Sequence, residues 1–536
     1  MSEQGHGGVA VARALKALGV GHLFTLSGGH IFPILDGCHQ DGIRLLDTRH
    51  EQAATFGAEA YGRLSRNLGV AAVTAGPGVT NAVSPIAQAR FNSAPLLVLG
   101  GRAPAFRWGS GSLQEIDHVP FIDPLAESRT VTDTAAISDA VLDAARACMS
   151  VPRGPRFLDF PLDILFNMTD IEDVSLPPPE RPSPDAAAIA EVARLISEAE
   201  RPVIVAGSNV WLDRAEGALT TLVEAAELPC FTNGQGRGCL PADHRLAFSR
   251  ARSKGLKDAD LVVVAGTPLD FRLGFGVFDG GAKVVHIDSQ PTAQHVELAV
   301  AVGGSVDLIL EAVAEAIERA PDTKEWINLL RETEDAKRDQ AQADLHSTAT
   351  PIHPMRVYGE LVPLLDRDAV VVCDGGDFVS YAGREIPSYE PGGWLDPGPF
   401  GCLGVGPGYA MAARALYPER QVVIMYGDGA IGFSLGELES LVRHDLPVVM
   451  IVGNNGIWAL EKFPMQALYG YDVAAELRPG LRYDQIMETF GGKGEVVTDP
   501  DDIAPALKRA FDSGVPYLVN VLTDPSIAYP RSSNLA

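Results

Sequence analysis

Short apolar runs alternate with alanine-rich amphipathic stretches along most of the chain. In the first third, the runs are VAAVTA (70–75), PLLVLGG (95–101) and RFLDFP (156–161), and the stretches between them have helical spacing. Apolar runs of this length are typical of strands that are buried on both faces. Their alternation with helices predicts an α/β fold with a parallel sheet.

The same alternation occurs twice more, which predicts three Rossmann-like parallel-sheet domains. A proline-dense segment at 176–184 and a polar, helix-prone segment at 320–350 separate the three blocks. We therefore expect domains at 1–176, 185–345 and 350–536, with the first and third as candidates for one fold used twice. The later runs are RPVIVAG (201–207), DLVVVAG (260–266), KVVHID (283–288), AVVVCDGG (369–376), QVVIMYGDG (421–429), PVVMIVGNN (447–455) and PYLVNVLT (516–523).

Charge and composition restrict the possible binding partners and the location of the protein. The 536 residues include 69 acidic and 43 basic side chains, and the formal charge of −26 argues against nucleic-acid or membrane-surface partners. The six cysteines are scattered without a CxxC pair, as in a reduced protein. The start, MSEQGHGG, has no features of an export signal, and no apolar run approaches the roughly 18 residues of a membrane span. We expect a cytoplasmic protein.

Two strand ends in the third block carry the strongest chemical signal. The run QVVIMY leads into Gly427-Asp428-Gly429, and PVVMIV leads into Asn454-Asn455 one strand–helix–strand crossover later. Both ends are expected at the carboxyl edge of a parallel sheet, where such sheets bind ligands. Carboxylate and amide oxygens suit Mg²⁺, and glycines let backbone amides approach phosphates. Each motif alone is also an ordinary turn, but a hairpin at 454–456 fits a parallel sheet poorly.

The pattern from Gly427-Asp428-Gly429 to Asn454-Asn455 resembles the thiamine-diphosphate fingerprint. The resemblance covers the whole chain and points to the acetolactate synthase and benzaldehyde lyase-like superfamily. It implies a pyrimidine-binding, a central nucleotide-binding-like and a diphosphate-binding domain, with thiamine diphosphate and Mg²⁺ as cofactors. It further implies that Gly427, Asp428, Gly429 and Asn455 bind the cofactor, and that Asp428, Asn455 and the backbone oxygen of Ile457 bind the metal.

In the first block, Arg49-His50-Glu51 closely matches the segment that carries the family's activating glutamate. The family chemistry needs a carboxylate against the aminopyrimidine ring, and the resemblance assigns this catalytic and cofactor-binding role to Glu51. By residue type alone, Glu51 is also an ordinary first-turn helix glutamate. In the family it belongs to the neighbouring subunit, which implies a homodimer or homotetramer. Leu403, which lies among glycines, matches the apolar residue that supports the bound cofactor.

Two loops of the first block resemble the substrate side of the family site. His30, in Ser27-Gly28-Gly29-His30-Ile31, resembles the histidine of benzaldehyde lyase and related carboligases, and it can move protons near neutral pH. Gln114 matches a glutamine that faces the reacting carbonyl. The alternatives are a histidine bonded to the backbone and a solvated amide. Oxalyl-CoA decarboxylases usually carry an acid beside a tyrosine at the position of Gln114, so this loop favours carbon–carbon lyase chemistry.

A third stretch indicates which members of the family the chain resembles. Residues 482–494, which end in FGGKG, resemble 2-hydroxyacyl-CoA lyases and oxalyl-CoA decarboxylases. The leading hypothesis is a thiamine-diphosphate-dependent lyase and carboligase that reversibly cleaves a 2-hydroxyacyl-CoA to formyl-CoA and an aldehyde or ketone. The sequence departs from that pattern in two places, because Trp394 stands where an arginine is usual, and an asparagine is usual near Asp377. Other cations would then bind CoA, with Arg384 and the cluster Arg250, Arg252, Lys254 and Lys257 as candidates, although such a cluster is also an ordinary solvated face.

Relatives place FAD or ADP in the central domain, so ADP or the CoA nucleotide is expected there. The candidate contacts are Arg153, Arg272, Asp288 and Arg384. The tail at 529–535 is a candidate lid. The alternatives are a CoA-free acyloin lyase or carboligase of the benzaldehyde lyase or acetolactate synthase type, an oxalyl-CoA decarboxylase, a flavin-dependent thiamine oxidase, and a non-catalytic thiamine-binding protein.

Overall fold

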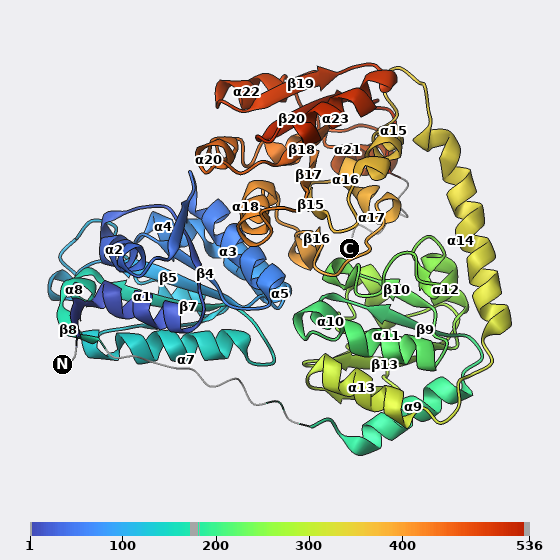
Figure 1. The fold of residues 1–536 in the computed structure, drawn as a ribbon, viewed down its shortest axis with the longest axis horizontal. Coiled ribbons are helices and arrows are strands. Elements are labelled where there is room, and N and C mark those ends of the chain that lie inside the picture. Colours follow the sequence, from blue (N-terminus) through green and yellow to red (C-terminus); the bar gives the residue numbers. More distant parts are fainter. Residues whose placement is uncertain (1–2, 172–180, 182, 530–536) are drawn as a thin grey trace. The chain divides into compact units, whose positions relative to one another are not determined.

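The computed structural model describes residues 3–171, 181 and 183–529 and contains three six-stranded parallel sheets (Figure 1). This architecture confirms the α/β fold class expected from the alternating pattern. The chain forms two compact units. The first comprises 1–180, 397–419 and 433–447, and the second comprises 181–396, 420–432 and 448–536. Most of the proline-dense connector and the end of the candidate lid, 530–536, lie outside the described residues.

The sheet of the first unit has the strand order β3-β2-β4-β5-β7-β6, with all neighbours parallel. Its strands are β2 (His22–Thr25), β3 (Arg44–Asp47), β4 (Gly69–Val73), β5 (Leu96–Arg102), β6 (Glu127–Thr130) and β7 (Arg156–Pro161). A short antiparallel pair joins β1 (Glu3–His6) to β8 (Met168–Ile171). The helices are α1 (Gly7–Ala17), α2 (Phe32–Gln40), α3 (Glu51–Ser65), α4 (Pro77–Asn81), α5 (Val83–Phe91), α6 (Val119–Ile122), α7 (Ile137–Met149) and α8 (Leu162–Phe166).

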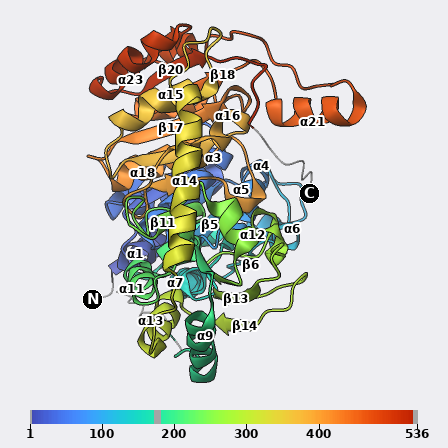
Figure 2. The same cartoon turned by 90° about the vertical axis from the view of Figure 1, so that its right-hand side faces the viewer.

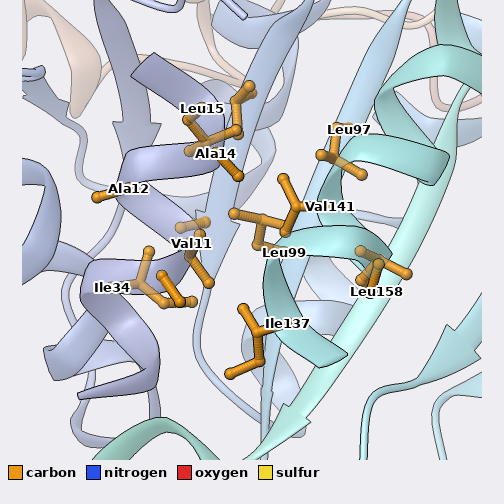
Figure 3. Packing of buried hydrophobic residues seen from close by; sticks show 14 of the residues in the cluster. Val11, Ala12, Ala14, Leu15, Ile34, Leu97, Leu99, Ile137, Val141 and Leu158 are labelled. Carbon is orange, nitrogen blue, oxygen red and sulfur yellow. The ribbon is translucent and has the colours of Figure 1, made fainter. Parts of the chain in front are cut away.

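A large hydrophobic cluster of this unit lies between the sheet and the helices α1, α2 and α7. Figure 3 shows Val11 and Leu15 of α1 near Val141 of α7 and Leu99 of β5, and all four are fully buried. The helices α1 and α2 approach closely because glycines face each other: a Cβ on Gly8 would lie 1.9 Å from the Pro33 carbonyl oxygen. This packing holds the strand ends that carry the candidate catalytic loops.

Two later segments of the chain fold with this first unit. They contribute α18 (Gly406–Leu416), which packs on α3, and α20 (Glu437–Arg443). Between α3 and α18 lies a buried ion pair in which Arg63 Nη1 is 3.3 Å from Glu59 Oε1. The Tyr409 hydroxyl donates to Glu59 and accepts from Arg63 and Gln88. Because buried charges need such partners, this network fixes α18 against α3.

The second unit contains the other two sheets. The central sheet has the order β11-β10-β9-β12-β13-β14, and the last sheet has the order β16-β15-β17-β18-β20-β19. The last sheet therefore repeats the strand order of the first, as the idea of one fold used twice requires. The strands are β9 (Pro202–Ala206), β10 (Cys230–Thr232), β11 (Ala247–Phe248), β12 (Leu261–Ala265), β13 (Lys283–Asp288), β14 (Val300–Gly303), β15 (Val370–Asp374), β16 (Trp394–Leu395), β17 (Val422–Gly427), β18 (Val449–Asn454), β19 (Lys493–Val497) and β20 (Tyr517–Leu522).

Helices cover both of these sheets, and the 22-residue helix α14 (Lys324–Leu345) leads from one to the other (Figure 2). Around the central sheet lie α9 (Ala186–Glu198), α10 (Ser208–Leu212), α11 (Glu216–Ala225), α12 (Arg252–Asp258) and α13 (Val306–Ala316). The last sheet carries α15 (Pro354–Leu361), α16 (Asp377–Ser380), α17 (Ala382–Glu385), α19 (Asp428–Ile431), α21 (Ala459–Tyr469), α22 (Tyr483–Thr489) and α23 (Ile503–Asp512). In the part of the chain that the structure describes, no helix is both long and apolar enough to cross a bilayer.

Candidate functional site

The predicted metal residues follow two neighbouring strands of the last sheet. Asp428 comes directly after β17 and Asn455 directly after β18, and these strands pair with Gly427 opposite Gly453. The amide of Gly456 donates to Asp428 Oδ2 at 2.6 Å, and the amide of Ile457 donates to Asn455 Oδ1 at 3.2 Å. The structure therefore brings Asp428, Asn455 and Ile457 together at one sheet edge.

The Asp428 carboxylate has the electrostatics of a cation ligand. Its side chain is buried, with 4% of the residue exposed, and burial raises its pKa to about 6, an effect that hydrogen bonds from backbone amides oppose. Within the described residues, no cationic side chain forms an ion pair with it. A buried carboxylate that lacks a counterion, beside an amide oxygen, fits a hard divalent cation such as Mg²⁺.

The same edge is the point where the order of the strands reverses. The chain runs from β15 to β16 on one side and then continues with β17 on the other side of β15, and ligands bind at such switch points in parallel α/β sheets. Gly375, directly after β15, has φ +116°, and a Cβ there would lie 2.6 Å from the Cβ of Ala430. A Cβ on Gly375 would also lie 3.1 Å from the backbone nitrogen of Gly427, so the ends of β15 and β17 meet too closely for a side chain at position 375.

Two aromatic residues support the Asp428 side of the candidate site. The Tyr483 hydroxyl, at the start of α22, donates to the backbone oxygen of Asp428 at 2.9 Å. The Trp458 ring packs on Gly429, where an added Cβ would lie 2.4 Å from it. These contacts hold the Gly427-Asp428-Gly429 turn from both sides.

Glu51 is the first residue of α3 and lies in the first unit. It is 6% exposed, and its Oε2 accepts a hydrogen bond from Asn81 Nδ2 at 2.9 Å. The turn before it is held by Glu437, whose two carboxylate oxygens each lie 3.1 Å from the Arg49 amide. Burial raises the pKa of Glu437. Glu51 therefore has a fixed position, and no cationic side chain of the described residues forms an ion pair with its carboxylate.

His30 and Gln114 converge on one threonine. His30 Nδ1 lies 3.3 Å from Thr74 Oγ1, which in turn lies 3.5 Å from Gln114 Oε1. Burial lowers the pKa of His30, so its imidazole is neutral near pH 7. Gln114 has φ +58°, an unusual conformation for a residue other than glycine. Because Gly78, next to Thr74, also borders Glu51, all three sequence-predicted residues lie around one strand end.

Leu403 lies half-buried in a loop of the first unit that folds through two glycines, Gly401 with φ +72° and Gly404 with φ +82°. At Gly404 a Cβ would lie 2.8 Å from Phe433. The amide of Cys402 donates to Gln88 Oε1 at 3.2 Å, which anchors the loop to the buried network of α3 and α18. Leu403 is thus presented on a rigid loop.

Cysteine reactivity gives a test of this arrangement. Five of the six cysteines are buried, and burial raises the pKa of Cys38, Cys148 and Cys230 to about 12, whereas Cys402 is partly exposed. We expect a thiol reagent such as DTNB at pH 8 to modify one thiol in the native protein and six after unfolding. In the Cys402→Ser variant the fast reaction should disappear, and a second thiol that reacts equally fast would contradict the packing.

The nucleotide candidates are largely engaged within the chain. Arg272 Nη2 lies 2.7 Å from Asp270 Oδ2, and the buried Asp288 accepts a hydrogen bond from Asn209 at 2.7 Å. Arg384 pairs with Glu385 at 2.6 Å. Asp288 ends β13 and Arg272 follows β12, its neighbour in the central sheet, whereas Arg153 belongs to the first unit.

The structure thus forms two residue groups, one in each unit. Glu51, His30, Gln114 and Leu403 belong to the first, and Asp428, Asn455 and Ile457 belong to the second.

Sequence reasoning missed Thr74, Asn81 and Glu437. The run Gly76-Pro77-Gly78 directly after a strand was a usable signal for the first two, since it marks a tight turn at a ligand-binding edge.

All three parts of the chain match domains of one enzyme family. Residues 5–121 match the thiamine pyrophosphate enzyme N-terminal TPP binding domain, residues 189–313 the central domain, and residues 374–521 the C-terminal TPP binding domain. The chain belongs to the thiamine pyrophosphate enzyme family, as its motifs implied.

Relatives divide between two activities. The chain is 54% identical to a probable acetolactate synthase of Mycobacterium bovis, over 99% of this chain and 98% of the relative. The same values hold for the acetolactate synthase large subunit IlvG of Mycobacterium tuberculosis. A 2-hydroxyacyl-CoA lyase 2 of Caenorhabditis elegans is 35% identical, over 96% of this chain and 89% of the relative.

Proposed function

We propose that the protein is a thiamine-diphosphate- and Mg²⁺-dependent carboligase of the acetolactate synthase type, which joins two carbonyl compounds without a CoA thioester. The observation that carries the proposal is the 54% identity, over nearly the full length, to proteins named acetolactate synthase. These relatives favour the CoA-free alternative over the 2-hydroxyacyl-CoA lyase expected from the sequence.

Three residues of the second unit would hold the metal and the diphosphate. Asp428 offers a buried carboxylate that has no cationic partner among the described residues, and Asn455 and the backbone oxygen of Ile457 would complete the protein ligands. The glycine-lined strand ends admit phosphate oxygens to backbone amides. Bound there, thiamine diphosphate would supply the carbon nucleophile that amino-acid side chains lack.

The residues of the first unit would orient the cofactor and the substrate, and they would move protons. Glu51 would share a proton with the aminopyrimidine ring of the cofactor, while Asn81 holds its carboxylate in place. His30, neutral because of burial, can accept or return a proton at the substrate oxygen, and the amide of Gln114 can donate to that oxygen. Since the family site is shared between subunits, we also propose a homodimer or homotetramer.

Charge pairing within the chain supports a CoA-free substrate. Arg250 Nη2 lies 2.6 Å from Glu385 Oε2, where the pair is buried, and Lys254 Nζ lies 2.8 Å from Asp258 Oδ2. Together with the pairs at Arg272 and Arg384, most of the cations expected to bind CoA phosphates already have carboxylate partners. Their charge is therefore largely neutralised before any ligand arrives.

The test is a comparison of substrates with the purified protein loaded with thiamine diphosphate and Mg²⁺. We expect pyruvate to yield 2-acetolactate, measured by mass spectrometry, and a 2-hydroxyacyl-CoA to yield no formyl-CoA. Formyl-CoA formation without any product from pyruvate would overturn the proposal and establish the second candidate.

That second candidate, a 2-hydroxyacyl-CoA lyase, rests on one specific observation besides the 34–35% identical relatives. A cavity of about 570 Å³ in the second unit is lined by five arginines and three carboxylates, namely Arg237, Arg250, Arg331, Arg338, Arg384, Asp243, Glu334 and Glu385. Its size suits a ligand of metabolite dimensions, and the excess of arginines over carboxylates, although Glu385 pairs with Arg250 and Arg384, favours an anion.

A further inference from the structure

His118 lies at the centre of a buried charge network that connects three strands of the first unit, β4, β5 and β7. Its side chain and that of Asp159 have no solvent exposure. The Gly76 amide donates to His118 Nε2 at 3.0 Å, and His118 Nδ1 lies 3.0 Å from Asp159 Oδ2. Arg102 Nη1 lies 2.9 Å from the same Asp159 oxygen. The network connects the loop after β4 to the end of β5 and to Asp159 within β7.

These contacts specify one form of the imidazole. Because the Gly76 amide can only donate, His118 Nε2 must be the unprotonated acceptor, and the proton must lie on Nδ1, where it is donated to Asp159. A protonated Nε2 would place two N–H groups against each other. Asp159, held by Arg102, therefore selects the tautomer that can bind Gly76.

Gly76 transmits this constraint to the candidate catalytic residues. It adopts φ +60° and ψ −111°, and a Cβ there would lie 2.9 Å from the Cβ of Gln114. Gln114, itself at φ +58°, thus rests against the Gly76 backbone. Gly76 also precedes α4, whose last residue, Asn81, holds Glu51. One backbone position therefore influences the placement of both Gln114 and Glu51.

We propose that His118, oriented by Asp159 and Arg102, is a positioning residue that holds Gly76 so that Gln114 and Glu51 face the reacting groups. The functional part of this inference rests on the proposed thiamine-diphosphate chemistry, whereas the backbone part concerns the protein alone. A displacement of the catalytic side chains by about 1 Å, even when a mutation away from the reacting groups causes it, can lower the rate on the order of 100-fold.

The test compares three substitutions with a matched control. His118→Gln keeps an acceptor for Gly76 and a donor for Asp159, whereas His118→Phe fills the space and keeps neither. Asp159→Asn removes the charge that fixes the Nδ1–H tautomer of His118 and replaces one carboxylate oxygen by an amide group that donates, which favours the wrong tautomer. His22→Phe is the control, because His22 is another histidine of the first unit, which lies in β2 and contacts Tyr61.

Hydrogen exchange of the unloaded protein, followed by mass spectrometry, reports on the peptide that contains Gly76. We expect His118→Phe and Asp159→Asn to accelerate exchange there at least about tenfold, and His118→Gln and His22→Phe to change it little. Unchanged exchange in Asp159→Asn would overturn the inference even if His118→Phe failed to fold. This readout requires no substrate, so it separates this inference from the proposed function.

Turnover of the loaded enzyme gives the second readout. With pyruvate, kcat/KM should fall about 10- to 100-fold in His118→Phe and stay within about threefold in His118→Gln. If His118 acts through Gln114, the His118→Phe loss should shrink in a Gln114→Ala background. Equal losses in His118→Gln and His118→Phe, with equally lowered melting temperatures, would mean that His118 only supports the fold, and would overturn the positioning role.

Discussion

Replacing Glu51 by glutamine is expected to lower kcat/KM by about 10²- to 10⁴-fold while the protein stays folded and still binds thiamine diphosphate. Glutamine has the shape of glutamate and can keep the contact with Asn81. It cannot share a proton with the aminopyrimidine ring, so only the proton-transfer step is lost. Steady-state kinetics with the substrate found in the comparison of pyruvate and acyl-CoA would measure the effect.

The appropriate control removes a carboxylate elsewhere in the same unit. Asp143→Asn breaks an exposed i,i+3 pair with Arg146 on α7 and should leave turnover unchanged. Calorimetry with thiamine diphosphate and Mg²⁺ should show binding to Glu51→Gln. Turnover at the wild-type level in Glu51→Gln would remove Glu51 from its assigned role.

Asp428→Asn is expected to abolish the stabilisation of the protein by thiamine diphosphate and Mg²⁺. At a 100-fold excess over Kd, a ligand stabilises the folded state by about 2.7 kcal/mol, which raises the melting temperature of the wild type measurably. The substitution removes the negative charge that offsets the cation. The unloaded variant should remain folded, because the loss of a buried, uncompensated charge costs little.

Differential scanning fluorimetry with and without both cofactors would measure this shift. Asp512→Asn, at the exposed end of α23, should keep the full shift and so controls for the change in net charge. A full Mg²⁺-dependent shift in Asp428→Asn would contradict the assignment of this carboxylate to the metal.

Much of the fold followed from the sequence because buried parallel strands are nearly continuous apolar runs. The strands β17 and β18 lie within the runs predicted at 421–429 and 447–455, so Asp428 and Asn455 were expected at strand ends. Lengths were less predictable: the crossover between these strands, expected to hold one helical stretch, contains the short helix α19 and the separate helix α20, with the poor helix formers Gly432 and Gly436 between them.

The contacts that arrange the site were not predictable, because they join residues distant in sequence. No local pattern shows that Arg250 pairs with Glu385, or that Glu437 binds the turn before Glu51. The left-handed conformation of Gln114 is equally invisible, since glutamine rarely adopts it and only the packing against Gly76 requires it.

The packing of α18 on α3 has a consequence for protein engineering. Chimaeras between relatives are usually cut at linkers, but a graft of the N-terminal portion alone would separate Glu59 and Arg63 from the Tyr409 hydroxyl. It would also separate the Arg49 amide from Glu437. A functional exchange must therefore transplant 397–419 and 433–447 together with the first 171 residues. The unit that can be exchanged is defined by contacts between these segments and not by their order in the chain.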